Sequence, residues 1–245
     1  MICADEKNVG TPVALTPHIA PVTRSLTAGL IALLGILAAR SSLASKIILP
    51  SFPSIGGAFG LTTRDLGVTL SSFFVAFALG QLVVGPLSDR FGRRPLVWGG
   101  LLTFAIGSVI AASATDLNIL VAGRVVQALG VCAASVLSRA IARDLFEGHD
   151  LARVLSITTI ATAAASGFSP LLGTAIEGVF GWRAVFGGVA VTSLIAAIGY
   201  RMSVGETLVA HGRSAASLTT VARSYGSLLV DMRFLAPALT VSFAQ

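Results

Sequence analysis

The stretch VGPLSDRFGRRP, residues 84–95, places four charged side chains and two glycines between two long apolar runs. The run before it extends from Leu66 to Leu87, and the run after it extends from Leu96 to Ala114. A helix needs about 20 apolar residues to cross the roughly 30 Å hydrocarbon core of a bilayer. The two runs therefore predict two membrane-spanning helices that are joined by a short, charged turn.

The composition of the whole chain also indicates a membrane protein. Of its 245 residues, 54% are hydrophobic and only 11% are charged, and the mean hydropathy is +0.87. A soluble domain carries about 25% charged residues. The net charge is +6, but outside residues 90–94 the basic residues form no run. We therefore expect the lipid bilayer as a partner and no nucleic acid.

Six apolar runs of spanning length predict an all-α membrane protein with six transmembrane helices. The runs are 28–49, 66–87, 96–114, 118–141, 154–176 and 184–202. The predicted parts are a cytoplasmic N-terminal tail at 1–27, a six-helix bundle at 28–202, a cytoplasmic linker at 203–233 and the truncated start of a seventh helix at 234–245. The stretch LPSFPSIGG, residues 49–57, is predicted to be a turn after the first run.

The placement of arginine predicts which ends of the helices face the cytoplasm. Three arginines follow the second run, three surround the connection after the fourth, and four lie at or after the end of the sixth. The alternate connections carry only Arg64 and Arg183. Because Lys and Arg concentrate in cytoplasmic loops, we expect the N-terminus and the arginine-rich connections to be cytoplasmic.

The stretch at 85–95 resembles the signature loop of the major facilitator superfamily, G-x-L-[AS]-D-R-x-G-R-[RK]. The matching residues include Gly85, Asp89, Arg90, Gly92, Arg93 and Arg94. The resemblance implies that the six helices form the N-terminal half-bundle of that fold. It also implies a gate at the cytoplasmic side, in which Arg93 pairs with Asp144 and Asp89 faces a helix of the other half. Gly85 is expected to allow close approach to a neighbouring helix.

A second stretch, AGRVVQALGVCAAS at residues 122–135, resembles the family pattern R-x-x-Q-G-x-G through Arg124 and Gln127. The resemblance implies contact with the first helix and a role in proton coupling. An arginine inside the membrane is costly, so it should face the bundle interior and find partners there. The alternative is a structural arginine that snorkels to the outer surface.

A third stretch, ASGFSPLLGT at residues 165–174, resembles the antiporter pattern g-x-x-x-G-P-x-x-G-G. Ala165, Ser169 and Gly173 recur every four residues and form a small-residue face beside Pro170, which is expected to kink the helix. An ordinary helix-packing interface is the alternative interpretation.

The stretches ILPSFPSIGGAFG, GWRAVF and RDLF are similar to the drug:proton antiporter branch of the family, in particular its Bcr/CflA-like bicyclomycin and chloramphenicol efflux group. The resemblance implies a multidrug efflux transporter of the bacterial inner membrane that exports small drug-like molecules in exchange for protons. It implies a C-terminal half-bundle as a missing partner. We expect no cofactor and no metal, and the absence of a Walker loop from the sequence argues against ATP hydrolysis.

The chain departs from that branch in the first run, where the branch carries an acid shortly before the LP pair. Lys46 occupies that place in SKIILP, residues 45–50, and Arg40 lies further inside the run. Lys46 is either an interfacial lysine or, with Arg40 and Arg124, one of three cations that face a cavity for anionic or neutral substrates. Glu177, at the outer end of the fifth run, is a candidate proton carrier.

Two other functional classes are alternatives to transport. An intramembrane enzyme would need a buried nucleophile with a histidine or an acid pair, and His18, His149 and His211 all lie outside the runs. We therefore expect no enzymatic activity. The other class is a truncated, non-transporting product or a membrane scaffold, because transporters of this kind place their site between two halves.

Overall fold

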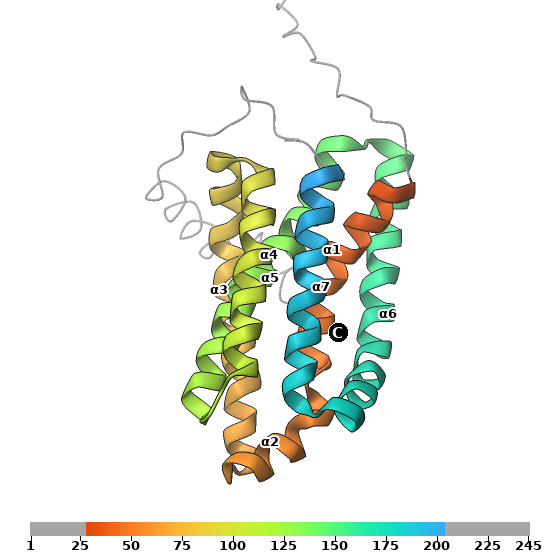
Figure 1. The fold of residues 1–245 in the computed structure, drawn as a ribbon. Coiled ribbons are helices and arrows are strands. Elements are labelled where there is room, and N and C mark those ends of the chain that lie inside the picture. The colour runs from red at the N-terminus through yellow and green to blue at the C-terminus, as the bar shows by residue number, and fades with distance from the viewer. Residues whose placement is uncertain (1–27, 204–245) are drawn as a thin grey trace, which may run out of the picture.

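The computed structural model describes residues 28–203, which form one bundle of helices with no strand in that range (Figure 1). The helices are α1 (Ala28–Lys46), η1 (Leu49–Ser51), α2 (Phe52–Phe59), α3 (Thr63–Phe91), α4 (Arg93–Ala112), α5 (Leu117–Leu145), α6 (Gly148–Phe180) and α7 (Trp182–Ser203). Six spans among these residues are long and apolar enough to cross a membrane, with α1, η1 and α2 counted as one. The predicted all-α fold is confirmed. The tail at 1–27, the linker from residue 204 and the helix start at 234–245 lie outside the described residues.

The predicted turn at 49–57 is wrong, because this stretch continues the first span as η1 and α2. Its two prolines occupy the first turns of these short helices, where a missing N–H leaves no hydrogen bond unmade. The span ends instead at Gly60, whose φ of 64° lies in the left-handed region that glycine adopts without strain.

Side-chain caps start α3 and α5 at positions that precede the start of the corresponding apolar runs. Thr62 Oγ1 accepts a hydrogen bond from Asp65 N, and the Asp65 carboxylate accepts one from Thr62 N, which is a reciprocal capping box. Asp116 Oδ1 accepts a hydrogen bond from Ile119 N at 3.0 Å. These caps satisfy backbone donors where hydropathy has already fallen, so the helices extend beyond the apolar pattern.

α5 lies at the centre of the bundle, packed against α1, α3 and α4. Its contact with α4 depends on glycine, because a Cβ at Gly100 would lie 2.7 Å from Gly130 O and one at Gly107 would lie 2.8 Å from Gly123 O. Neither distance leaves room for a side chain. The two backbones therefore approach as closely as small residues permit in membrane helices.

The helices α3 and α6 lie on opposite flanks of the bundle in Figure 1 and expose many large apolar side chains. These include Phe74, Val75, Leu79, Leu82 and Val83 on α3, and Phe168, Leu171, Leu172, Val179 and Phe180 on α6. Soluble monomers rarely expose such continuous apolar surface. These faces therefore lie against lipid or against another membrane helix.

Candidate functional site

Three charged side chains meet at one end of the bundle, where α3, α4 and α5 come together. Arg93 Nη1 lies 3.0 Å from Asp89 Oδ1, and Arg93 Nε lies 3.0 Å from Asp144 Oδ2. Arg93 also donates a hydrogen bond from Nη1 to Ser88 Oγ. We call Ser88, Asp89, Arg93 and Asp144 the Arg93 cluster. The pairing of Arg93 with Asp144 that the resemblance implied is present, and the role of this cluster as a gate stays a prediction.

The local backbone explains why these groups converge. Gly92 ends α3 and precedes α4, and its φ of 96° favours a residue without a Cβ. This turn makes Arg93 the first residue of α4, so its side chain reaches both Asp89 in the last turn of α3 and Asp144 near the end of α5. Only 12% of the Arg93 side chain is exposed, so its ion pairs are screened less than surface pairs are.

The other residues of the motif lie outside the Arg93 cluster. Arg90 is exposed, with its Cζ 5.4 Å from the centroid of the Phe91 ring. Arg94 donates a hydrogen bond from Nη2 to the carbonyl oxygen of Arg201 on α7, at 2.9 Å. A Cβ at Gly85 would meet no atom of another described helix within 4 Å, so the expected close approach is not made within this part of the chain.

A second polar network is buried around Arg124 of α5, which is only 1% exposed. Arg124 Nη1 donates hydrogen bonds to Ala44 O on α1 at 3.0 Å and to Gln127 Oε1 at 2.9 Å. Gln127 Nε2 donates in turn to Ser108 Oγ on α4 at 2.6 Å. The Arg124 Cζ lies 4.2 Å from the centroid of the Phe73 ring on α3. We call these five residues the Arg124 network, and it connects four helices.

The burial of Arg124 excludes the alternative that its side chain snorkels to the outer surface, and its predicted contact with the first helix is present through Ala44. The cost of an arginine inside a bilayer, about 2.5–3.5 kcal/mol on insertion scales, is reduced by these partners. Two of its nitrogens, Nε and Nη2, are buried without a hydrogen-bond partner among the described residues. The guanidinium therefore retains donors for a further group. Its role in proton coupling stays a prediction.

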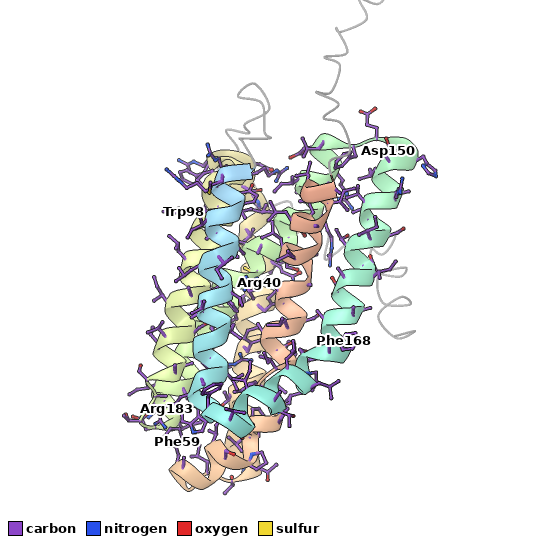
Figure 2. The ribbon with its side chains drawn as sticks, turned by 45° about the vertical axis from the view of Figure 1, so that its right-hand side comes forward. Arg40, Phe59, Trp98, Asp150, Phe168 and Arg183 are labelled. Atoms are coloured by element: carbon purple, nitrogen blue, oxygen red, sulfur yellow. The ribbon has the colours of Figure 1, made fainter. Side chains whose placement is uncertain are left out.

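Arg40 and Lys46 occupy surroundings different from those of Arg124. Arg40 is 5% exposed, and its guanidinium donates hydrogen bonds to the hydroxyl and the backbone carbonyl of Thr192 on α7. Lys46 is the last residue of α1 and is exposed. Figure 2 shows Arg40 about midway along the bundle. Among the described residues the three cations thus have different surroundings, and a cavity that all three face stays a prediction.

The predicted small-residue face of α6 packs against the first span, at Ile47 directly after α1. A Cβ at Gly173 would overlap the carbonyl oxygen of Ile47, and Ser169 is fully buried. Ala165 and Pro170 are half-buried on the same helix. The described residues thus show a packing interface, and an antiporter role for this motif stays a prediction.

Glu177 lies near the end of α6, at the opposite end of the bundle from the Arg93 cluster. Its Oε1 accepts a hydrogen bond from Ser54 Oγ on α2 at 2.5 Å. The carboxylate therefore joins the last turn of α6 to the short helix that continues the first span. A role for Glu177 as a proton carrier stays a prediction.

Sequence reasoning missed the groups that complete both networks, namely Ser88, Ser108 and Phe73. Ser88 fills the [AS] position of the signature loop, but the pattern does not indicate a contact with Arg93; serine and phenylalanine occur throughout the apolar runs, so neither residue type nor spacing marks Ser108 and Phe73. A signal was available for the contact between α4 and α5. It is a repeat of glycine at seven-residue spacing, two helical turns, in Gly100 and Gly107 on α4 and in Gly123 and Gly130 on α5.

Comparison with known proteins places this arrangement among transporters. A sequence profile described as Major Facilitator Superfamily matches residues 33–245. The chain is 35% identical over 147 residues to the chloramphenicol resistance protein of Pseudomonas aeruginosa, covering 60% of this chain and 35% of that protein. It is 30% identical over 211 residues to the bicyclomycin resistance protein homolog of Haemophilus influenzae, covering 86% of this chain and 53% of that protein.

A solved structure with a similar fold is a bacterial homologue of the human lysosomal transporter Spinster, in an inward-facing and unoccupied conformation. The TM-score is 0.68 at 17% sequence identity, over 78% of this chain and 44% of that chain. At this identity the likeness concerns the fold alone. Some curated relatives align with most of this chain, and the chain spans about half of their length.

Proposed function

Because this chain belongs to the Major Facilitator Superfamily, we propose that it forms the N-terminal half of a multidrug-efflux transporter that exports small drug-like molecules in exchange for protons. Its relatives include chloramphenicol and bicyclomycin resistance proteins, in agreement with the drug:proton antiporter branch that its motifs resemble. The proposed partner is a second six-helix half, because transporters built from such repeats bind substrate between them near the membrane midplane. We propose no enzymatic reaction for the chain.

The observation that carries this proposal is the Arg93 cluster. One guanidinium holds the ends of α3, α4 and α5 through two carboxylates. The Asp89 side chain is 46% exposed, so it remains accessible to a group from the second half. A carboxylate is stabilised near a helix N-terminus, which is the contact we propose for Asp89. Breaking and remaking that contact would accompany the rocking of the two halves.

We assign proton coupling to the region of the Arg124 network. Lys46 stands where the branch carries an acid, so the proton carrier we propose is Glu177 or an acid of the second half. Arg124 would modulate the protonation of that carrier, because two buried nitrogens of Arg124 lack hydrogen-bond partners among the described residues. A nearby carboxylate would be held in its charged form by such a guanidinium.

We propose that the protein lies in the bacterial inner membrane with its N-terminus in the cytoplasm. Within residues 28–203, the ends of α3, α5 and α7 and the starts of α4 and α6 carry seven arginines. The opposite ends carry Arg64 and Arg183. Such an imbalance favours the arginine-rich end on the cytoplasmic side, and we propose the same side for the Arg93 cluster.

The test is drug susceptibility in a bacterial host that lacks its major efflux pumps and expresses the complete reading frame encoding this chain. The panel includes phenicols, bicyclomycin and anionic compounds. We expect a severalfold rise in the inhibitory concentration of at least one compound, which an uncoupler of the proton gradient abolishes. Asp89→Asn and Arg93→Ala should return it to the level of the empty vector, because each breaks the Arg93 cluster while leaving the six apolar spans intact.

Arg153→Ala is the matched control, because it removes an exposed arginine from α6 at the same end of the bundle. It should retain resistance. Membrane levels of each variant are measured by immunoblotting of the membrane fraction. Full resistance in the Asp89 and Arg93 variants would contradict the gate. Resistance to no compound at normal membrane levels, or export that survives the uncoupler, would contradict drug:proton antiport.

A further inference from the structure

A pocket of about 280 Å³ lies between the start of α4 and the end of α7 and is lined by Arg94, Pro95, Trp98 and Arg201. Arg201 Cζ lies 5.4 Å from the centroid of the Trp98 ring, and Arg94 Nη2 donates a hydrogen bond to the Arg201 carbonyl oxygen. These contacts direct two guanidinium groups to one opening. The four described residues that line the pocket include two arginines and no acid, so this part of the lining is suited to an anion.

A second pocket of about 280 Å³ lies between the same two helices and is entirely apolar. It is lined by Leu102, Ala105, Ile106, Val109 and Ile110 on α4, and by Ala190 and Leu194 on α7. Residues 98, 102, 105 and 109 recur at helical spacing, so the basic pocket and the apolar pocket lie on one face of α4. Residues 190, 194 and 201 form the matching face of α7. The two pockets therefore lie in line along the contact between α4 and α7, and we call them together the groove between α4 and α7.

The length of this groove matches one leaflet of a membrane. At a rise of 1.5 Å per residue, Leu102 and Val109 lie about 6 and 16 Å along α4 from Trp98. Leu194 and Ala190 lie about 10 and 16 Å along α7 from Arg201. Half of the hydrocarbon core is about 15 Å thick. Trp98 is partly exposed, and tryptophan is a residue type that is enriched at membrane interfaces.

We propose that the groove between α4 and α7 binds one anionic phospholipid, with its headgroup phosphate against Arg94 and Arg201 and one acyl chain along the apolar part. Guanidinium groups bind phosphate oxygens through paired hydrogen bonds, and basic pockets between transmembrane helices are suited to anionic headgroups. A free phosphate would use only the basic pocket, whereas the apolar pocket below it gives a place to an acyl chain. The inference rests on membrane embedding and not on transport.

The test uses tryptophan fluorescence, because the chain has only two tryptophans. Trp182→Phe leaves Trp98 as the only fluorescent indole, and Trp98→Phe leaves Trp182, which is buried at the other end of α7. The chain is reconstituted in vesicles of phosphatidylglycerol and phosphatidylcholine in which either lipid carries brominated acyl chains that quench tryptophan. Circular dichroism establishes that each variant keeps its helix content.

We expect brominated phosphatidylglycerol to quench Trp98 more strongly than brominated phosphatidylcholine at the same mole fraction, and we expect no such preference at Trp182. Arg201→Gln and Arg94→Gln should each reduce the preference about fivefold, the change expected for one basic side chain at an anionic surface. Arg153→Gln, which removes an exposed arginine outside the groove, should leave it unchanged. Equal quenching by the two lipids, or a preference that survives both Arg94→Gln and Arg201→Gln, would overturn the proposal.

Two additional measurements separate other occupants of the basic pocket. Inorganic phosphate at 20 mM, against chloride of equal ionic strength, should not remove the preference; its removal by phosphate alone would show a site for small anions and overturn the proposal. Glu206 follows Arg201 by five residues in the sequence. A preference that appears only in Glu206→Gln would show that the chain's own carboxylate occupies the pocket, which would also overturn it.

Discussion

At the scale of single residues, two arginines show different ways of holding charge in an apolar bundle. Arg93 lies between two carboxylates at helix ends, one of them nearly half exposed. Arg124 contacts a carbonyl oxygen, an amide oxygen and an aromatic face, all of them neutral. Neutral partners avoid the desolvation of a second buried charge. The Arg93 pairs are therefore suited to breaking and re-forming, whereas the Arg124 network is suited to a fixed connection among four helices.

The Arg124 network predicts a cost for a substitution that preserves charge. Arg124→Lys keeps the cation but lacks the planar group that bonds to Ala44 O and Gln127 Oε1 and packs over the Phe73 ring. We expect a loss of about 2 kcal/mol in the free energy of unfolding, from weakened hydrogen bonds and a weakened cation–π contact. The measurement is denaturant-induced unfolding in mixed detergent micelles, followed by circular dichroism.

Arg139→Lys is the matched control for this experiment, because Arg139 lies on the same helix and is exposed. Its free energy of unfolding should change by less than about 0.5 kcal/mol, as expected for a surface substitution. Equal effects of the two substitutions would show that the contacts of Arg124 contribute no more to stability than a surface arginine does.

At the scale of the helices, hydropathy predicts the six spans well because lipid leaves a buried backbone few alternatives to helix. It predicts their ends poorly. Thr62 and Asp116 extend two helices through hydrogen bonds that hydropathy does not include, and Pro50 and Pro53 start short helices where a turn is predicted.

Within the candidate site, Arg93 and Asp144 could be paired from the family motif. The backbone carbonyls that accept hydrogen bonds from Arg40 and Arg124 could not be predicted, because a carbonyl such as Ala44 O has no sequence signature.

The contact between α4 and α5 predicts opposite outcomes for two glycines of α4. Gly107→Ala places a methyl group against the backbone of α5, where no space exists. Overpacking of this kind costs about 1–3 kcal/mol. Gly99→Ala is the matched control, because a Cβ there meets nothing within 4 Å. It should be neutral or stabilising by up to about 1 kcal/mol, since alanine loses less backbone entropy in a helix. Unfolding in mixed micelles measures both, and equal stability of the two variants would contradict a backbone contact at Gly107.

At the scale of the whole molecule, the arginines concentrate at one end of the bundle, and the exposed apolar side chains concentrate on its flanks. Figure 2 shows Trp98 and Asp150 at one end of the bundle and Phe59 and Arg183 at the other. The end with Trp98 carries seven arginines of the described chain, among them those of the Arg93 cluster and of the basic part of the groove between α4 and α7. The flanks at α3 and α6 are apolar. Because the proposed gate and the proposed lipid site lie at the same end, the orientation of the chain in the membrane decides on which side of the membrane both lie.

That orientation is testable with single cysteines. Cys3→Ser and Cys132→Ala remove the native thiols, and His149→Cys or Thr115→Cys then places one exposed thiol at the arginine-rich end or the opposite end. We expect a membrane-impermeant maleimide to label Thr115→Cys in spheroplasts and His149→Cys only in inverted vesicles, because arginines are retained on the cytoplasmic side. The chain with Cys132 as its sole thiol is the control, since that side chain is fully buried and should stay unlabelled from either side. Labelling in the reverse sense would place the Arg93 cluster outside the cell, where it could not close a cytoplasmic gate.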